Sequence, residues 1–457
     1  MIQNNSKPFF TKKFLVCLVL PLVAEQFLAM TIGICDTIMV SSIGAPGVSA
    51  VSLIDQLGQL VIQLFAAFAT GGAVVASQYL GHKEEDQACR SAKQLLYLCC
   101  AVGVMIIAIC LPLRRFIIGG IFGGIEADIM TNALNYFVWI LFSFPLIGIY
   151  NSCAALCRSM GNSKISLKVS IVMNVINVAG NALLIYGLKA GVAGAGISTL
   201  VSRGIAALIM ILILKNRKWP IHLKELWKVE INLGLIGKIL KVAVPSGIEN
   251  SIFHVGKTLV YSFMSGFGSV AIAANAISNS VCSFSNIPGN AVGLASVTIV
   301  GQCIGAGEKQ QAKKYGRLMM YLSYAGMCIT GIFILIFAPQ CVKIFKLAED
   351  ISSLSVGVIR TCMIANMLFW AMSFTMPNIL RGAGDAKYTM IWSLAGMWAF
   401  RVGGSYLISK YLLGRFPDHE EYALYGIWIG MYIDWVFRGA MFLGRFMGKR
   451  WLDKKVI

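Results

Sequence analysis

The chain has 457 residues, of which 57% are hydrophobic and only 13% are charged, about half the charged share of an ordinary soluble domain. This composition excludes a soluble globular protein of the same length. The formal net charge of +19 would suit a nucleic-acid-binding protein, but the basic residues are spread along the chain between apolar blocks, and we expect no nucleic-acid partner.

The apolar blocks each come close to the ~20 residues that a helix needs to cross a bilayer. Backbone polar groups in lipid must be paired within their own segment, so these blocks predict helices. In chain order we predict twelve spans: 14–43, 49–76, 92–118, 128–157, 164–187, 191–214, 236–265, 271–300, 315–340, 354–380, 388–412 and 423–448. The first block is too long for a signal-peptide core and is expected to stay in the membrane.

The basic residues fall on one side of this predicted topology. The termini and the loops on their side hold 27 of the 39 Lys and Arg residues, the opposite loops hold eight, and four lie within spans. Because cytoplasmic loops carry the excess of positive charge, we predict that both termini are cytoplasmic. The expected location is the cell inner (plasma) membrane, where the chain would be a multi-pass protein surrounded by the lipid bilayer, and we expect a monomer.

The second half of the chain repeats the first. One constant shift pairs Pro21 with Pro245 and Glu25 with Glu249, and further matches keep nearly the same register as far as Lys164 and Lys387. The basic, proline-containing stretch 215–234 separates the copies. We therefore predict an N-terminal lobe at 1–214 with helices 1–6, a cytoplasmic linker at 215–234 and a C-terminal lobe at 235–457 with helices 7–12.

Six spans in each half give both copies the same orientation in the membrane. The predicted fold is an all-α polytopic membrane protein whose two six-helix lobes are related by a pseudo-two-fold axis along the membrane normal. Repeats of this kind occur in secondary transporters, whose substrate sites lie near the midplane between the halves.

Ionisable side chains within spans are costly, about 3 kcal/mol at the bilayer centre, and are therefore candidates for function. Asp36 is the strongest, because it lies deep in the first span with no cation within one helical turn. Such a carboxylate either takes up a proton or binds a cation, and both behaviours suit a coupling site. The alternative is a structural hydrogen bond to a neighbouring helix.

Asn174, Asn177 and Asn181 lie on one face of the fifth span, because their spacings are three and four residues. Thr199 on the sixth span can add a hydroxyl group. A stripe of amide oxygens suits both cation coordination and hydrogen bonding between helices, and the sequence leaves both interpretations open.

Glu25 and Glu249 each follow a proline by four residues, which places the carboxylate on the face where the helix bends. They are candidates for lining a substrate cavity between the lobes. Equally, each can pair with a residue such as Lys257 or His254 in its own half.

Further charged residues within spans need a partner. Asp55 and Arg401 are candidates for binding substrate or each other. Asp434 and Arg438 are four residues apart and are expected to pair on one helix face.

Enzyme motifs such as HExxH, GxSxG and the P-loop do not occur in the sequence. We therefore expect no enzyme activity and no cofactor. The energy for transport would come from an ion gradient, with Na⁺ or H⁺ as the coupling ion.

Several stretches of the chain resemble the multidrug and toxic compound extrusion (MATE) family of transporters, in its prokaryotic form. They are PLVAEQFLAMTIGICDTIMVSSIG (21–44), GGAVVASQYLGHKEEDQA (71–88), CRSMGNSK (157–164), NVINVAGNALLIYG (174–187), GVAGAGIST (191–199), VPSGIENSIFHVGKTLV (244–260), SVTIVGQCIGAGEKQQAKK (296–314) and LRGAGDAK (380–387). The resemblance implies twelve helices in two lobes around a central cavity. It also implies a secondary active antiporter that exports lipophilic, often cationic, organic small molecules in exchange for Na⁺ or H⁺ by alternating access.

Branches of this family with a cation site in the N-terminal lobe use an acid on the first span, an Asn and an Asp on the fifth and a Thr on the sixth. The matching positions are Asp36, Asn177, Asn181 and Thr199. The resemblance thus makes Asp36 the Na⁺ candidate. This chain has Asn181 where those branches have the second acid, so its site has one negative charge fewer. Another branch uses acids on spans 7 and 10, where this chain has Glu249 one turn too early and Trp370.

Two other functions remain open from the sequence. A flippase for lipid-linked precursors, from the same superfamily, would need a cavity rich in basic residues. A receptor or scaffold in the membrane that does not transport would give no flux from sealed vesicles.

Overall fold

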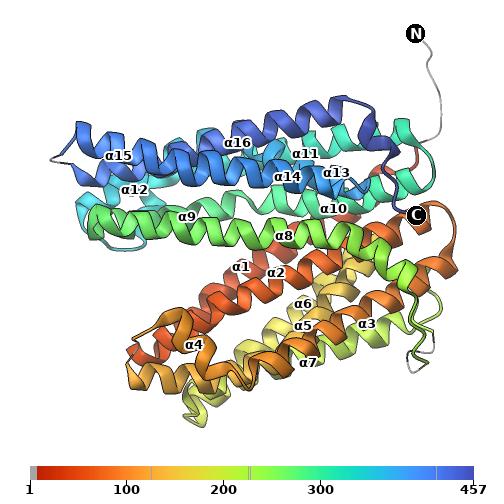
Figure 1. Cartoon of the computed structure of the whole chain (residues 1–457), viewed down its shortest axis with the longest axis horizontal. Coiled ribbons are helices and arrows are strands. Elements are labelled where there is room, and N and C mark those ends of the chain that lie inside the picture. The colour runs from red at the N-terminus through yellow and green to blue at the C-terminus, as the bar shows by residue number, and fades with distance from the viewer. Residues whose placement is uncertain (1–7, 125, 225, 227, 418) are drawn as a thin grey trace. The chain divides into compact units, whose positions relative to one another are not determined.

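The computed structural model describes residues 8–457 except residues 125, 225, 227 and 418, and of residues 265 and 420 it describes only the backbone. Helices make up nearly all of this described chain, which contains no β-strand (Figure 1). The chain divides into two compact units, residues 10–247 and residues 248–456, which we call the N-unit and the C-unit. The division falls inside one long helix, α8.

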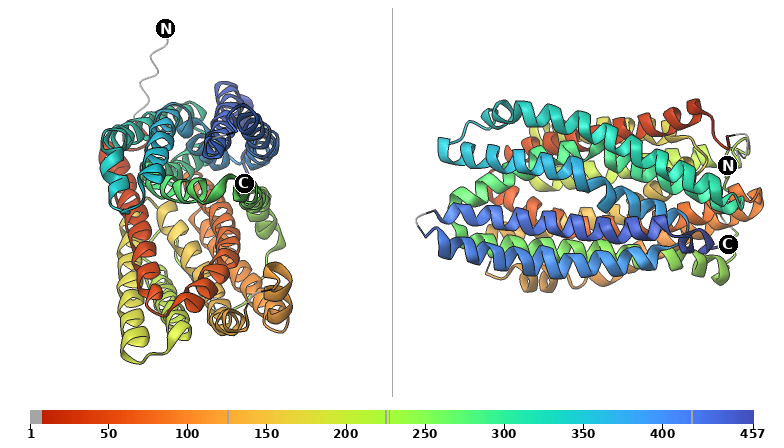
Figure 2. Two further views of the ribbon diagram at one scale, coloured as in Figure 1. Left: turned by 90° about the vertical axis from the view of Figure 1, so that its left-hand side faces the viewer. Right: turned by 90° about the horizontal axis from the view of Figure 1, so that it is seen from above.

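The N-unit is a bundle of long helices that lie side by side when seen end-on (Figure 2). Its elements are α1 (Lys12–Ser41), α2 (Ala45–Gly81), α3 (Glu85–Cys110), α4 (Arg114–Phe122), α5 (Ala127–Ser159), α6 (Ser163–Asn181), η1 (Ala182–Gly187), α7 (Gly191–Leu214) and the first half of α8 (Leu233–Met264). The hydroxyl of Thr11 caps α1 by accepting a hydrogen bond from the Phe14 amide at 3.2 Å. The element η1 continues α6 as a π-helical turn.

The C-unit begins with the second half of α8 and is equally helical. Its further elements are η2 (Ser265–Phe267), α9 (Gly268–Ser285), α10 (Ile287–Gly305), α11 (Lys309–Lys343), α12 (Glu349–Ala365), η3 (Asn366–Thr375), α13 (Met376–Gly382), α14 (Ala386–Gly396), η4 (Met397–Gly404), α15 (Ser405–Arg415), η5 (Glu420–Tyr422), α16 (Ala423–Met447) and η6 (Arg450–Asp453). The elements η3 and η4 are π-helical and keep their flanking helices continuous.

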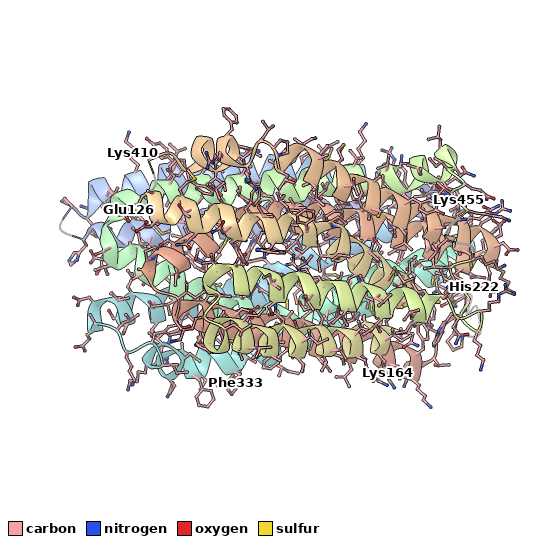
Figure 3. All side chains as sticks on the ribbon, turned by 90° about the horizontal axis from the view of Figure 1, so that it is seen from below. Glu126, Lys164, His222, Phe333, Lys410 and Lys455 are labelled. Carbon is pink, nitrogen blue, oxygen red and sulfur yellow. The ribbon has the colours of Figure 1, made fainter. Side chains whose placement is uncertain are left out.

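The helices have the length and composition of membrane spans. Within the described residues, nine helical segments are long and apolar enough to cross a membrane. Large apolar side chains point outward, such as those of Phe116, Ile329 and Phe333, which are 77%, 72% and 58% exposed, and Figure 3 shows Phe333 pointing away from the bundle. Exposed apolar side chains of this size are stable when lipid rather than water surrounds them. The chain is thus an all-α, multi-pass membrane protein.

The segments 233–264, 386–415 and 423–447 are not among these nine. Each is a long helical segment, and each was predicted as a span. Their interiors carry charged side chains, including Lys257 in α8, Arg401 in η4 and Arg438 in α16, and charged groups lower the mean hydropathy. All three segments contribute to the C-unit.

Two predicted spans differ from the structure in detail. The span predicted at 271–300 is two helices, because α9 ends at Ser285 and α10 starts at Ile287 with Pro288 in its first turn, a position that proline favours. The span predicted at 92–118 ends earlier, because α3 stops at Cys110 and the short helix α4 follows.

The backbone repeats at tight turns in the two units. Gly161, between α5 and α6, has φ +79°, and its counterpart Gly384 in the C-unit has φ +101°. Side chains other than glycine rarely adopt such angles. A Cβ at Gly161 would also collide with the ring of Phe14, so this turn holds α6 against α1.

Candidate functional site

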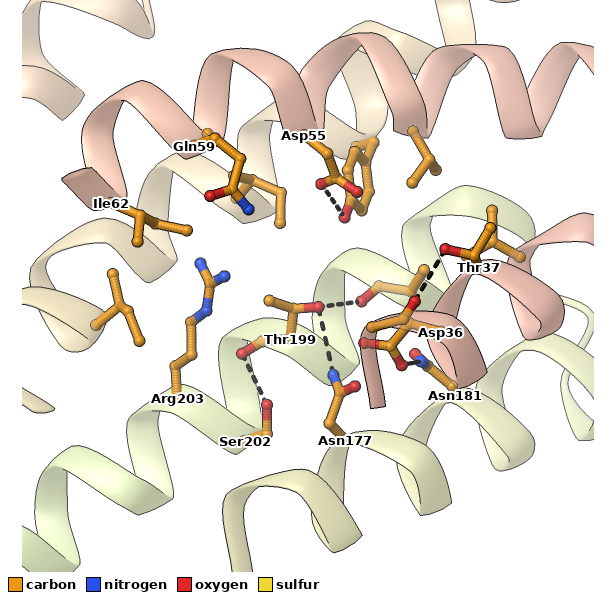
Figure 4. Close-up of a pocket in the computed structure, with 18 of the residues that line it drawn as sticks. Asp36, Thr37, Asp55, Gln59, Ile62, Asn177, Asn181, Thr199, Ser202 and Arg203 are labelled. Atoms are coloured by element: carbon orange, nitrogen blue, oxygen red, sulfur yellow. Dashed lines mark hydrogen bonds between the residues drawn. The ribbon is translucent and has the colours of Figure 1, made fainter. Parts of the chain in front are cut away.

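A cavity of about 310 Å³ lies inside the N-unit and is bounded by α1, α2, α5, α6 and α7. Its wall is rich in polar side chains that point toward one another (Figure 4). Six of the residues singled out from the sequence line it: Asp36, Asp55, Asn174, Asn177, Asn181 and Thr199. The structure thus brings together residues from four helices, α1, α2, α6 and α7.

Asp36 lies on α1 and is half-buried at this cavity. Its Oδ1 accepts a hydrogen bond of 2.9 Å from Nδ2 of Asn181, the last residue of α6 before the π-helical turn η1. The remaining amide oxygen of Asn181 is buried without a hydrogen-bond partner among the described residues. One carboxylate and one unsatisfied amide oxygen therefore lie at the same point of the wall.

Asn177 is one turn before Asn181 on α6, and one of its amide atoms faces the Asp36 carboxylate at 2.8 Å from Oδ1 and 3.1 Å from Oδ2. If that atom is the nitrogen, it donates to the carboxylate. If it is the oxygen, Nδ2 faces Thr199 Oγ1 at 3.4 Å, and three oxygens crowd together. Facing oxygens repel one another, so the orientation with the nitrogen at Asp36 satisfies both the amide and the carboxylate.

Thr199 and Asn174 complete the polar wall at unequal distances from Asp36. The Thr199 hydroxyl donates to the Ala195 carbonyl at 2.9 Å, which leaves its lone pairs available toward Asn177. Asn174 Nδ2 donates to Ser170 Oγ at 3.3 Å. Asn177 and Asn181 are thus the members of the stripe that contact Asp36, whereas Asn174 lies farther along the cavity.

Two residues that sequence reasoning did not assign to the site also line the cavity. Tyr136 of α5 donates its hydroxyl proton to Asp55 Oδ1 at 3.0 Å. Arg203 of α7 donates to Ser143 Oγ at 2.7 Å, and its guanidinium group points toward Gln59 (Figure 4). The presence of arginine within an apolar span was the available signal for Arg203; Tyr136 gave none.

Glu25 and Glu249 are buried and bound to arginines of their own units. Glu249 Oε2 lies 2.6 Å from Arg381 Nη2, and Glu25 Oε1 lies 3.9 Å from Arg158 Nη1. Neither glutamate lines the N-unit cavity. The partners differ from Lys257 and His254, which sequence proximity had suggested.

Serine hydroxyls support both glutamates. Ser166 donates to Glu25 Oε2 at 2.7 Å, and Ser393 donates to Glu249 Oε1 at 2.6 Å. A buried carboxylate is stable when it is both paired and hydrogen-bonded. Each glutamate has both kinds of partner, an arginine and a serine of its own unit, and this arrangement is that of a structural ion pair.

Arg401 is placed in the C-unit rather than in the N-unit cavity. Its Nη1 lies 3.8 Å from Asp434 Oδ2. Asp434 Oδ1 is also 2.9 Å from Arg438 Nε, which is the pair expected from their spacing on α16. Asp55 and Arg401 were candidates for binding each other, but Asp55 contacts Tyr136.

Comparison with known proteins identifies the family. The family model MatE matches the chain twice, at residues 21–183 and 245–407. The two matches start at Pro21 and Pro245, the pair of prolines that the sequence repeat aligns. Together they cover most of the chain.

Bacterial transporters are similar to this chain over nearly its full length. The "Uncharacterized transporter YisQ" of Bacillus subtilis is 27% identical over 95% of this chain and 94% of the relative. The "Probable multidrug resistance protein NorM" of Thermotoga maritima is 26% identical over 98% of this chain and 94% of the relative.

Solved structures share the fold. An outward-facing "multidrug resistance MATE family transporter of the MOP superfamily" gives a TM-score of 0.88 at 20% identity, covering 97% of both chains. A crystal structure of "MATE in complex with MaL6" gives 0.86 at 20% identity with the same coverage. The double match of the family model, over two units of one membrane fold, shows that this chain belongs to the MatE family of MATE transporters.

Proposed function

We propose that this protein is a secondary active antiporter that exports lipophilic, often cationic, organic compounds in exchange for Na⁺ or H⁺ by alternating access, with Asp36 as the coupling carboxylate. The observation that carries the proposal is the pair of amide groups gathered at the Asp36 carboxylate. The carboxylate faces an amide atom of Asn177 at 2.8 Å and the amide of Asn181, whose oxygen has no other partner among the described residues.

We infer that the Asn177 amide can turn between two orientations when a cation binds at Asp36. Without a cation, its nitrogen can donate to Asp36. With a cation, the amide can rotate so that its oxygen joins the carboxylate, and its nitrogen then turns toward Thr199 Oγ1. Both orientations leave the amide hydrogen-bonded, which keeps the exchange inexpensive.

Na⁺ is the ion that we favour over H⁺. A carboxylate with amide and hydroxyl neighbours offers the oxygen ligands that hard cations prefer. Asp36, Asn177, Asn181 and Thr199 are the residues that would hold it. Protonation of Asp36 is the alternative and would need no further ligand.

The substrate class rests on charge in the N-unit cavity and on the relatives. The cavity contains the carboxylates of Asp36 and Asp55 and the guanidinium of Arg203, so it carries net negative charge when the three groups are ionised. Several relatives carry the name "Probable multidrug resistance protein NorM". We place the protein in the plasma membrane with both termini in the cytoplasm, working as a monomer.

Flux measurements on reconstituted protein test this function. The purified chain would be placed in sealed liposomes loaded with rhodamine 123, a lipophilic cation, and Na⁺ and pH gradients would be imposed one at a time. We expect dye movement that depends on one of the two gradients. Absence of gradient-dependent flux for a panel of organic cations would instead support a receptor or scaffold.

A further inference from the structure

Three cationic side chains gather around one aromatic ring in the C-unit. Lys257 Nζ lies 5.3 Å from the ring centroid of Phe253, Arg401 Cζ lies 4.8 Å from it and Arg438 Cζ lies 5.5 Å from it. Arg438 also lies 4.5 Å from the ring of Phe374. Contacts of this kind are attractive because the ring face is electronegative, but the three cations repel one another.

One carboxylate lies among these three positive charges. Asp434 is 2.9 Å from Arg438 and 3.8 Å from Arg401, and it is fully buried. Glu249, which lies one helix turn before Phe253 on α8, is engaged by Arg381. Across the residues that the structure describes, Lys257 has no carboxylate partner, so the cluster carries a surplus of two positive charges.

Several donors of the two arginines make no hydrogen bond in the described part of the chain, and neither do the two oxygens of Asp434 beside them. Arg401 and Arg438 are only 9% and 2% exposed, yet Arg401 Nη1 and Arg438 Nη2 lack a hydrogen-bond acceptor in the described part of the chain. Arg401 Nη2 contacts the thioether sulfur of Met431 at 2.7 Å, and thioethers are weak acceptors. Buried guanidinium groups normally satisfy these donors with oxygens.

Lys257 differs from the arginines because its side chain is exposed. It lies within α8, two turns before the helix ends at Met264. A charged lysine within a span is stable where water or a counter-charge reaches it. The cluster is therefore accessible through Lys257 and backed by two buried arginines.

The local backbone is irregular where these residues are placed. Arg401 belongs to the π-helical segment η4, and Phe374 belongs to the π-helical segment η3. Wide turns of this kind are frequent at functional sites. Trp370 stacks on Phe374 with ring centroids 4.7 Å apart, which extends the aromatic surface beside the guanidinium of Arg438.

The repeat places no charged residue opposite Lys257 in the N-unit. The register that pairs Glu25 with Glu249 also pairs Gly33 with Lys257, and Gly33 belongs to the acidic cavity of the N-unit. At this position the two copies of the repeat thus differ in charge, with a lysine in the C-unit and a glycine beside two carboxylates in the N-unit. A purely structural ion pair would need equal numbers of acids and bases, and unpaired buried charge is strongly destabilising.

We propose that Lys257, Arg401 and Arg438 form a binding site for the oxyanion of a small aromatic molecule, a carboxylate or phosphate group. Planar guanidinium groups bind such oxyanions in bidentate fashion, and a bound oxyanion would supply the acceptors that the arginines lack. The same chemistry is offered by the headgroup of an anionic lipid. The site goes beyond the proposed cation-coupled export, and its occupancy needs neither a gradient nor Asp36.

Binding of two related dyes tests this site directly. Purified protein in nanodiscs of phosphatidylcholine would be titrated with fluorescein, an aromatic anion, and with rhodamine 123, a cation built on the same ring system, and fluorescence anisotropy would be recorded. For Lys257→Gln we expect the Kd of fluorescein to rise about tenfold, as the loss of one charge-assisted contact predicts, while the Kd of rhodamine 123 stays the same or falls.

Two control variants separate charge from folding. Lys257→Arg keeps the charge and should keep fluorescein binding. Lys410→Gln removes an exposed charge from α15 of the same unit and should leave the Kd unchanged. Adding phosphatidylglycerol to the nanodiscs distinguishes the sources of the oxyanion: competition in the wild type but not in Lys257→Gln identifies a lipid headgroup, and no competition identifies a soluble anion.

The proposal is overturned if the wild type shows no saturable fluorescein binding. It is equally overturned if Lys257→Gln binds fluorescein like the wild type, or if Lys257→Arg loses binding as fully as Lys257→Gln. These outcomes leave cation coupling at Asp36 untouched, because the dye titration contains no ion gradient.

Discussion

Glu249 and Arg381 form a buried ion pair in the C-unit, with Oε2 and Nη2 2.6 Å apart, and their repeat counterparts Glu25 and Arg158 form the same pair in the N-unit at 3.9 Å. The sequence repeat relates the glutamates to each other and the arginines to each other, with the shift changed by a single position between them. The hydroxyl partners are also related, because Ser166 of the N-unit corresponds to Thr389, which donates to Glu249 at 3.5 Å. The duplication has therefore preserved a contact between helices as well as a sequence pattern.

These pairs predict that the glutamates act on stability. Glu249→Gln should lower the free energy of unfolding by about 3 kcal/mol or more, because it leaves the Arg381 charge buried without its partner. Glu25→Gln should cost less, since its pair is longer. Thermal unfolding in detergent measures both changes, with Glu308→Gln on the exposed loop before α11 as the control. A selective loss of cationic over neutral substrates at an unchanged melting temperature would instead assign the glutamates to substrate binding.

The sequence predicts the fold of this protein well because its signals are local. Apolar blocks, basic loops and the register of the repeat are all read along the chain, and the same holds for the three-and-four spacing of Asn177 and Asn181. Cation coordination and hydrogen bonding between helices were both open for these amides, and the structure places both amides at the Asp36 carboxylate.

Other features depend on tertiary contacts that spacing does not encode. The partners of Asp55 and Arg203 come from α5, which supplies Tyr136 and Ser143. The π-helical turns have no local sequence signal that we recognise. The gathering of Lys257 and Arg401 at one ring also requires that α8 and η4 be packed together, although the two residues lie far apart in the chain.

Asn181→Asp should strengthen cation binding in the N-unit. A second carboxylate would replace the amide that now donates to Asp36 at 2.9 Å, and two carboxylates attract a shared cation more strongly than one. We expect the Na⁺ concentration for half-maximal transport to fall about tenfold. Asn181→Ala, which adds no charge, should raise that concentration. A Na⁺ dependence that is identical in Asn181→Asp and the wild type would separate this residue from the ion.

Arg203→Gln should also strengthen cation binding in the N-unit cavity, because it removes a positive charge. The guanidinium lies in the cavity that contains Asp36 and Asp55, and its positive charge opposes entry of another cation. Its removal should improve the apparent affinity for Na⁺ or for rhodamine 123, by about tenfold at an effective dielectric constant near 20. Arg203→Lys is the matched control and should resemble the wild type. Weaker cation affinity in Arg203→Gln, at unchanged thermal stability, would contradict the electrostatic account of the cavity.

Transport by Asp36→Asn tests the central claim most directly. The variant removes the charge but keeps the shape and an acceptor for Asn181, so the fold should persist; Asp128→Asn, at an exposed acid in the first turn of α5, is the control. In liposomes loaded with rhodamine 123, whichever of the imposed Na⁺ and pH gradients drives efflux by the wild type should also drive efflux by Asp128→Asn and should drive none by Asp36→Asn. Gradient-driven efflux by Asp36→Asn at the wild-type rate would contradict cation coupling at Asp36.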